Sequence, residues 1–189
     1  MLTRSKGVDF VGVSAYFPPD ELEHILAALM PPNRLALEVS LATGLRISDV
    51  LNLKTSELKS PMIVRELKTG KRRRVTFKRG LLDSLVAQSG KVWVFEGRTN
   101  YRKHRTRQAV YKDLVRAARL FRLPVSVQLS PHSMRKVYAV GKFGRSDGDI
   151  AKVQKALNHA SPAITALYVM SGELYERNKA KRERGRARV

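Results

Sequence analysis

Apolar residues recur along most of the chain with the period of an α-helix. Residues 21–30 follow a Pro-Pro-Asp start signal and have their apolar positions on one face, which predicts an amphipathic helix. We expect Pro31-Pro32 to end this helix, Asn33 to cap the next one, and Gly44 to stop that second helix. The same periodicity predicts two further helices, over 81–88 and 108–121.

The period changes in the middle of the chain. Residues 62–66 and 72–77 resemble two strands, and the glycine-containing segment between them predicts a hairpin. Residues 57–60 are a candidate edge strand. Residues 92–95 (VWVF) resemble a short buried strand or extended segment, and we expect Trp93 to lie in the core.

Two helix starts in the last third of the chain place a serine before a proline, at Ser130-Pro131 and Ser161-Pro162. With the periodicity around them, they predict three helices, over 131–143, 147–157 and 161–170. A last helical piece, 172–184, carries many charges. No internal repeat or low-complexity linker interrupts the chain, so these elements predict one mainly helical domain with a small antiparallel sheet.

The excess of basic over acidic residues limits the kinds of partner that the protein can bind. The chain has 37 Lys and Arg against 16 Asp and Glu, a net charge of +21, while 43% of its residues are hydrophobic. A globular protein with this excess calls for an anionic partner, and nucleic acid is the obvious one. An anionic membrane is the alternative, but the sequence has no long apolar span and no signal peptide.

Cysteine and histidine usage excludes several chemistries. The sequence has no cysteine, which excludes disulfides, thiolate catalysis and cysteine zinc sites, and fits a reducing cytosol. Its four histidines show no metal-ligand spacing such as HExxH, so no metal site is predicted.

The segment 97–107 (GRTNYRKHRTR) is strongly basic and contains one aromatic residue, Tyr101. Its charges are all of one sign and have no acidic partners nearby in the sequence. We therefore predict a loop that contacts phosphates, with a solvated surface loop as the alternative.

A small set of residues could form an anionic site. His132 and Arg135 lie three apart in a predicted helix and therefore project from the same face. The other candidates are Arg46 after Gly44, Lys68 in the hairpin turn, His159 and Tyr168. Each alone has an ordinary explanation: a cap for Arg46 or His159, a solvated Lys68, a core Tyr168. Their joint occurrence is harder to explain that way.

The segments that hold these residues are ATGLRISDVLNL, LKTGKRRRVTF, PHSMR and LNHASPAITALYV. Together they resemble the catalytic domain of the tyrosine recombinase (phage integrase) family, whose pattern is Arg, Lys, His-x-x-Arg, His or Trp, then Tyr. The resemblance implies a domain over 17–175, of the α+β class and mainly α, between a leader at 1–16 and a basic tail at 176–189. Lys71 lies close to Lys68 and is a second candidate for the lysine.

The resemblance implies a role for each residue. Tyr168 would attack a DNA phosphodiester and give a 3′-phosphotyrosine and a free 5′-hydroxyl. Arg46 and Arg135 would hold the non-bridging oxygens, because guanidinium groups match phosphate geometry and stay charged. His159 would donate a further hydrogen bond to the phosphoryl group. Fixed cations would stabilise the developing charge, so the reaction would need no metal and no other cofactor.

Proton transfer and support would fall to other residues. Lys68 would be the general acid for the leaving 5′-oxygen, and His132 would assist proton transfer with the nucleophile. Asp49 matches an acidic position that orients the site. Two positions depart from the family pattern: Asn158 stands where a glycine is frequent, and Lys136 where a histidine is frequent. Neither departure removes a catalytic group.

The implied partner is double-stranded DNA containing recombination sites. The residues predicted to contact it are Arg72, Arg73, Arg102, Lys103, Arg105, Arg107 and Lys136. The family also assembles as a tetramer on DNA by exchanging a C-terminal segment, and Leu174 and Tyr175 would anchor that segment here. Family members usually clamp DNA with an additional N-terminal domain, so we expect either a compact enzyme or a clamp supplied by another segment or an accessory DNA-binding protein.

Two other functions stay open at this point. A recombinase-like module could bind DNA without cutting it, although the complete set of candidate residues favours catalysis. A nicking-closing enzyme of the topoisomerase IB type would share the chemistry without needing paired sites. Either enzyme would act in the cytoplasm, as a nucleoid-associated or a virus-encoded protein, and not at a membrane.

Overall fold

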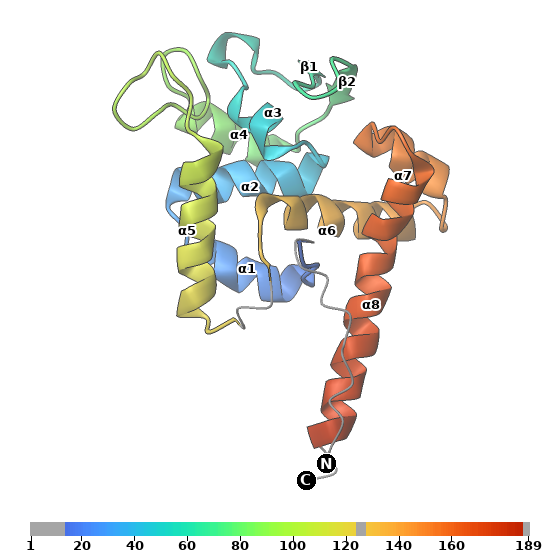
Figure 1. The fold of residues 1–189 in the computed structure, drawn as a ribbon. Coiled ribbons are helices and arrows are strands. Elements are labelled where there is room, and N and C mark those ends of the chain that lie inside the picture. The colour runs from blue at the N-terminus through green and yellow to red at the C-terminus, as the bar shows by residue number, and fades with distance from the viewer. Residues whose placement is uncertain (1–13, 124–127, 187–189) are drawn as a thin grey trace.

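Two helices packed against each other, α2 (Pro31–Thr43) and α6 (Pro131–Gly144), lie at the centre of the fold (Figure 1). The computed structural model describes residues 14–123 and 128–186. Its other helices are α1 (Pro19–Ala27), α3 (Ile47–Leu51), a 3₁₀ helix at Thr55–Glu57, α4 (Arg79–Gln88), α5 (Arg107–Leu120), α7 (Ile150–Leu157) and α8 (Pro162–Arg186). Helix α1 packs on α5 at one side of the centre, and α8 packs on α6 at the other.

The predicted hairpin is present. Strands β1 (Met62–Arg65) and β2 (Arg72–Val75) pair antiparallel, with Met62 opposite Val75. The connecting turn is closed by the Gly70 N–H, which donates to the Glu66 carbonyl at 2.8 Å, and Gly70 has a φ of +66°, a conformation that favours glycine. With the helices around it, this sheet confirms the predicted fold class, α+β and mainly α.

The start of α2 differs from the prediction. Pro31 and Pro32 occupy the first helical positions and begin the helix, because the N–H groups of a first turn have no partner inside the helix anyway. Asn33 therefore lies within the helix and does not cap it. Its buried side chain donates instead to Asp113 on α5, at 2.7 Å, and so ties two helices together.

Two predicted strands are absent from the described residues. The segment 57–60 begins at the last residue of the 3₁₀ helix and has no strand, and 92–95 forms one isolated bridge, between Trp93 and Lys54. Trp93 is half-buried rather than in the core, because its indole N–H reaches out to the Arg102 carbonyl at 3.1 Å. That bond holds the basic loop against the domain.

The last two predicted helical pieces form one helix. Helix α8 runs from Pro162 to Arg186 without a break, so it crosses the predicted boundary between 175 and 176. Gly172 lies within this helix and does not end it. A Cβ at this position would lie 3.1 Å from the Val140 side chain, so the glycine allows α8 to approach α6. The predicted leader, 1–16, lies outside the described residues except for 14–16.

The helices enclose two apolar clusters. The larger one joins α1 to α5, the hairpin and the start of α6, and the smaller one joins α6, α7 and α8 through Ala139, Val153, Leu157 and Val169. Within residues 14–123 and 128–186, no helix is both long and apolar enough to cross a bilayer.

Candidate active site

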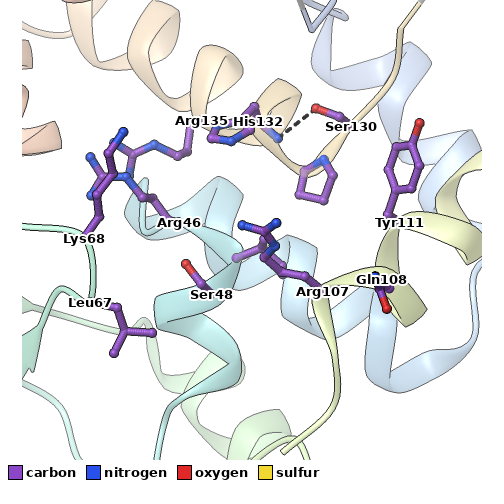
Figure 2. Close-up of a pocket in the computed structure, with 12 residues that line it drawn as sticks. Arg46, Ser48, Leu67, Lys68, Arg107, Gln108, Tyr111, Ser130, His132 and Arg135 are labelled. Atoms are coloured by element: carbon purple, nitrogen blue, oxygen red, sulfur yellow. Dashed lines mark hydrogen bonds between the residues drawn. The ribbon is translucent and has the colours of Figure 1, made fainter.

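A cavity of about 600 Å³ lies between α3, the hairpin turn and the starts of α5 and α6 (Figure 2). The basic side chains that line it are Arg46, Lys68, Arg107, His132 and Arg135. Its uncharged polar lining residues are Ser48, Gln108, Tyr111 and Ser130. No acidic side chain lines it among the described residues, so the cavity suits an anion.

The turn after α2 positions the first arginine. Gly44 has a φ of +68° and ends α2, and a Cβ there would lie 2.5 Å from the Tyr138 ring. The chain then leaves the turn in extended conformation and reaches Arg46, the residue that precedes α3. The Arg46 guanidinium reaches the cavity wall, where its Nη1 donates to the Glu66 carboxylate at 2.7 Å.

Arg135 is held from the opposite side, by α6. Its side chain is only 1% exposed, and it donates to the Gly44 carbonyl and, at 3.2 Å, to the Leu157 carbonyl. These carbonyls end α2 and α7, where the helix dipoles favour a cation. Burial, followed by the positive charge of Arg46, lowers the pKa of Arg135 to about 10, so the group remains charged at neutral pH.

His132 occupies the first turn of the same helix. Ser130 accepts from the His132 backbone N–H at 3.2 Å and forms a capping box with Ser133, which confirms the predicted helix start. The imidazole is exposed to the cavity. Desolvation there, followed by the charges of Arg135 and Arg46, lowers the pKa of His132, so the neutral ring can accept a proton at neutral pH.

Of the two lysines in the hairpin turn, Lys68 lines the cavity and Lys71 is not among its lining residues. The Lys68 side chain is exposed and points toward Arg46 in Figure 2. The turn that carries it is held by Asp49, whose Oδ1 accepts from the Leu67 N–H at 2.9 Å. Burial raises the pKa of Asp49, and its other oxygen has no hydrogen-bond partner in the described part of the chain.

His159 connects the arginine site to α8. Its Nε2 lies 3.2 Å from Arg135 Nη2, and its Nδ1 lies 3.1 Å from the hydroxyl of Thr165. Because a guanidinium can only donate, Nε2 must be the acceptor and Nδ1 must carry the proton. Burial, followed by the charges of Arg135 and Arg46, lowers the pKa of His159 to about 4, so the ring is neutral at neutral pH.

Tyr168 lies on the other side of His159. The two rings meet edge to face with their centroids 5.0 Å apart, and the tyrosine is half-buried against the smaller apolar cluster. Tyr168 is not among the residues that line the cavity, whereas Tyr111 is. The structure thus brings Arg46, Lys68 and His132 with Arg135 into one cavity and places Tyr168 next to it, through His159.

The comparison with known families decides the identity of the domain. The chain matches the phage integrase family over residues 15–173. It belongs to this family.

No group of three or more His, Asp or Glu side chains in residues 14–123 and 128–186 is placed to hold a metal ion.

Relatives of this phage integrase family member support the assignment. It is 32% identical over 160 residues to "Putative integrase/recombinase y4qK" of Sinorhizobium fredii, covering 80% of this chain and 50% of the relative. It is 25% identical over 168 residues to "Tyrosine recombinase" of Thermosipho africanus, covering 82% of this chain and 56% of that protein. The chain thus spans about half the length of these curated relatives.

Solved structures show the same fold. The XerH site-specific recombinase bound to its difH substrate aligns with a TM-score of 0.65 and 22% identity, over 82% of this chain and 50% of that one. The catalytic domain of bacteriophage HP1 integrase aligns with a TM-score of 0.62 and 20% identity, over 84% of this chain and 89% of that one.

Two residues predicted to contact DNA have internal partners in this integrase-family domain. Arg73 donates to the Thr43 and Gly44 carbonyls at the end of α2, and its side chain is 11% exposed. Lys136 is buried, donates to the Ser14 carbonyl, and lies 5.9 Å from the centroid of the Tyr168 ring. Both side chains therefore contribute to holding the fold together, and their contact with DNA stays a prediction.

The other predicted DNA contacts are more accessible. Arg72, Arg102, Lys103 and Arg107 are exposed, and Arg107 begins α5 at the cavity. Arg105 is half-buried; burial lowers its pKa, and its Nε has no hydrogen-bond partner in the described residues.

Sequence reasoning missed four residues of the site. Gln108 and Tyr111 lie three apart at the start of α5, a spacing that could have been noticed, and both line the cavity. Thr165 and Glu66 gave no signal, because a polar residue in an apolar helix or at a strand end is usually solvated. Both are fully buried.

Proposed function

We propose that this chain is the catalytic domain of a site-specific tyrosine recombinase, which cuts and rejoins double-stranded DNA through a 3′-phosphotyrosine. One observation carries the proposal: Arg46, Lys68, His132 and Arg135 share a cavity without acidic lining residues, and His159 joins Arg135 to Tyr168. Cations that converge on a single point and have a hydroxyl nucleophile beside them suit the transfer of one phosphoryl group.

The reaction exchanges one ester bond for another. The Tyr168 oxygen attacks the phosphorus and forms a P–O bond, while the bond between phosphorus and the 5′-oxygen breaks. His132 takes up the phenol proton, directly or through water, and Lys68 gives a proton to the leaving 5′-oxygen. A 5′-hydroxyl from a second DNA strand then attacks the phosphotyrosine, and the same steps in reverse rejoin the strands.

The arginines hold the phosphate during both steps. The contacts of Arg135 to Gly44 and Leu157 use two of its five N–H groups, so three remain for a non-bridging oxygen, including the one that faces His159 in the free protein. Arg46 makes one hydrogen bond, to Glu66, among the described residues and can turn its other edge to the phosphate. Such preorganised donors typically contribute about 10²- to 10³-fold in rate each.

His159 changes its role when the phosphate binds. Its Nε2 faces Arg135 as an acceptor in the free protein. Once the phosphate draws the Arg135 donor away, the ring proton moves to Nε2 and His159 donates to the phosphoryl oxygen. The Thr165 hydroxyl allows this shift, because it can donate to Nδ1 as readily as it accepts from it.

Covalent capture tests the proposal without knowledge of the target sequence. Purified protein is incubated with a pool of nicked duplexes of randomised sequence, and adducts stable in detergent are isolated. After cleavage, the short fragment that carries the freed 5′-hydroxyl diffuses away, so the strands cannot be rejoined. We expect adducts with the wild type and with Tyr111→Phe, and none with Tyr168→Phe. Tyr111 is the matched control, since it is the tyrosine that lines the cavity.

Other outcomes point to other functions. Tight binding of the pool without any adduct would identify a silent DNA-binding module. Adducts that survive Tyr168→Phe but vanish in Tyr111→Phe would reassign the nucleophile. Relaxation of supercoiled plasmids that lack paired sites would favour an enzyme of the topoisomerase IB type.

The proposal extends to the assembly on DNA. We propose a tetramer in which α8 contacts a neighbouring protomer through exposed apolar residues, among them Leu167 and Leu174, which are 67% and 50% exposed. Tyr175 does not serve as an anchor in the free chain, because its hydroxyl donates to Glu21 of its own α1 at 2.6 Å. We propose that a second DNA-binding unit, which the greater length of the relatives suggests, completes the contacts with DNA. The enzyme would be a nucleoid-associated or a virus-encoded protein.

A further inference from the structure

A buried carboxylate behind the cavity has no part in the steps above. Glu66 follows the last residue of β1, and its side chain is 0% exposed. A charged group in such a place is retained only where several partners compensate for the lost water.

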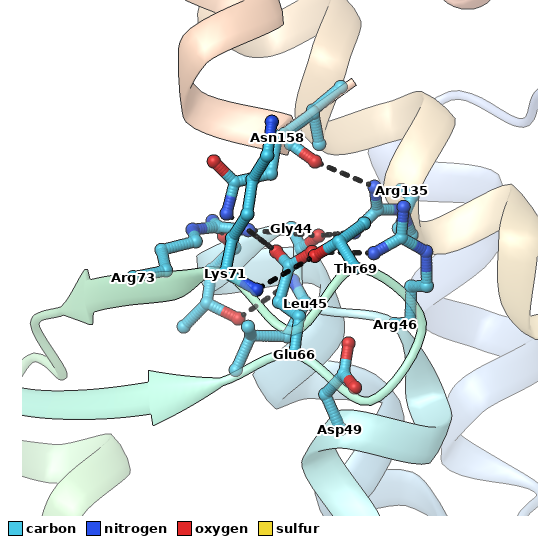
Figure 3. A network of polar contacts seen from close by, with 12 residues as sticks. Gly44, Leu45, Arg46, Asp49, Glu66, Thr69, Lys71, Arg73, Arg135 and Asn158 are labelled. Carbon is cyan, nitrogen blue, oxygen red and sulfur yellow. Dashed lines mark hydrogen bonds and ion pairs between the residues drawn. The ribbon is translucent and has the colours of Figure 1, made fainter. Parts of the chain in front are cut away.

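The partners of Glu66 come from three separate parts of the site (Figure 3). Its Oε2 accepts from Arg46 Nη1 at 2.7 Å and from the Thr69 hydroxyl at 3.0 Å. Its Oε1 accepts from Asn158 Nδ2 at 3.1 Å and lies 3.7 Å from Arg73 Nη1. Both carboxylate oxygens are therefore occupied.

Two of these partners adjoin a proposed catalytic residue, and Arg46 is itself one. Thr69 follows Lys68 in the hairpin turn, and Asn158 precedes His159. Asn158 ends α7 with a φ of +51°, a conformation that asparagine tolerates better than most residues, and its side chain is tied to Glu66. The carboxylate thus joins Arg46 to the turns that carry Lys68 and His159.

The local charges explain why an anion is needed here. The guanidinium groups of Arg46, Arg73 and Arg135 lie close enough that the charge of Arg46 lowers the pKa of the other two, after the larger effect of burial. Burial alone would raise the pKa of Glu66, but hydrogen bonds from Arg46 and Thr69 outweigh it and lower the pKa. Glu66 is therefore an anion at neutral pH.

We propose that Glu66 is a positioning residue that holds the Arg46 guanidinium toward the scissile phosphate before DNA binds. This inference rests on the proposed function. Glu66 touches one edge of Arg46 through Nη1 and leaves the other edge for the phosphate. Without the anion, the three arginines repel one another, and Arg46 moves out of the orientation in which it contacts a non-bridging oxygen.

The test compares two substrates that differ at the scissile phosphate. One duplex, recovered from the capture experiment, is made with the natural phosphate and with a methylphosphonate, in which a methyl group replaces one charged oxygen. The methylphosphonate is neutral, so its cleavage depends less on stabilisation of negative charge by Arg46. The variant is Glu66→Gln, and the control is Glu38→Gln, because Glu38 also pairs with an arginine at 2.7 Å, but on the surface of α2.

We expect Glu66→Gln to slow adduct formation about a hundredfold on the phosphate, the loss typical of a group displaced by an ångström. On the methylphosphonate, we expect a loss of less than about threefold, since little charge remains for Arg46 to stabilise. Glu38→Gln should match the wild type on both. An equal loss on the two substrates would show a general structural defect and overturn the inference, as would no loss on either.

A second variant and a second readout complete the test. If Glu66→Gln does not fold at the assay temperature, Glu66→Asp keeps the charge but retracts it, and should show a smaller loss with the same dependence on substrate. In the free protein, arginine-selective NMR should show hindered rotation of the Arg46 guanidinium, lost in Glu66→Gln and kept in Glu38→Gln. An Arg46 signal that is unchanged in Glu66→Gln would refute the inference, whether or not the wild type forms an adduct. The absence of an adduct with the wild type would refute the proposed function.

Discussion

The carbonyl oxygen of Gly44 accepts a hydrogen bond from the guanidinium of Arg135, which lies 91 residues later in the chain. The carbonyls at the end of a helix lack partners within it, and they carry the negative end of its dipole. Arg73 uses the same place, through the carbonyls of Thr43 and Gly44. The turn that directs Arg46 to the cavity therefore also anchors two other arginines, and the geometry of the site depends on it.

Replacing Gly44 by alanine should destabilise the domain. The φ of +68° strains any residue with a Cβ, and the added carbon would lie 2.5 Å from the Tyr138 ring. We expect a loss of about 1–3 kcal/mol in the free energy of unfolding, measured by urea denaturation. Gly80→Ala is the control, because Gly80 lies in α4 with nothing within 4 Å of its added Cβ, and should be neutral or slightly stabilising. Equal effects of the two substitutions would contradict this account of the turn.

Acid should weaken the fold through His159. The unfolded histidine titrates near its usual pKa of 6.5, whereas in the folded chain the pKa is lowered to about 4. Between these two pH values the unfolded chain binds a proton that the folded chain does not. The contribution of His159 to the free energy of unfolding is therefore complete above pH 6.5 and is lost as the pH falls toward 4. Its full size is about 3 kcal/mol.

The test follows the free energy of unfolding from about pH 7.5 to 4.5 in the wild type and in His159→Gln. The variant should show a weaker dependence on pH, because glutamine does not titrate. Carboxylates of the unfolded chain also begin to bind protons at the low end of this range, but they are present in both proteins. Parallel curves would mean that His159 does not have the lowered pKa.

Thr165 should matter although it does not line the cavity. It is fully buried, and its hydroxyl accepts the Nδ1 proton of His159. Thr165→Val keeps the shape but leaves that N–H without a partner, which should cost about 1–3 kcal/mol of unfolding free energy. Thr76→Val makes the same substitution at an exposed position and should change the free energy of unfolding little. A stable Thr165→Val variant with an unchanged His159 titration would argue against the assigned ring proton.

The sequence was sufficient for the hairpin, for most helices and for most of the cavity. Helical periodicity, the Ser130 cap and the glycine of the hairpin turn are local signals, and the structure has each of them where it was predicted. The convergence of Arg46, Lys68, His132 and Arg135 came from resemblance to a family, since their separations along the chain say nothing of distance in space.

The features that the sequence did not reveal share a physical cause. Arg73 and Lys136 were predicted only to contact DNA, and the hydrogen bond that each makes to a backbone carbonyl of the domain was not foreseen. Glu66 and Thr165 escaped notice because their partners lie in distant segments, at Asn158 for example, and pairing decides whether a polar group can be buried. Such pairing is invisible in a linear pattern.

Helix α8 should loosen from α1 when Tyr175 loses its hydroxyl. The phenol donates to both carboxylate oxygens of Glu21, at 2.6 and 2.7 Å, and its ring packs edge to face on Tyr16. We expect Tyr175→Phe to lower the unfolding free energy by about 1 kcal/mol and to speed amide hydrogen exchange in residues 172–180. Tyr111→Phe serves as the control on an exposed tyrosine, and identical exchange in all three proteins would show that the hydroxyl does not secure the helix.

The exposed apolar residues of α8 should govern association on DNA. Leu167 and Leu174 are 67% and 50% exposed, although burial of a leucine side chain is worth about 2 kcal/mol, so a contact with a neighbouring protomer would gain from covering them. Replacing both by glutamate should leave the fold and the single-site adduct intact but abolish complexes of several protomers, as measured by sedimentation on a duplex with paired sites. Leu120→Glu, at a position 63% exposed on α5, is the control and should assemble normally. Normal assembly of the double variant would exclude this face of α8 from the interface.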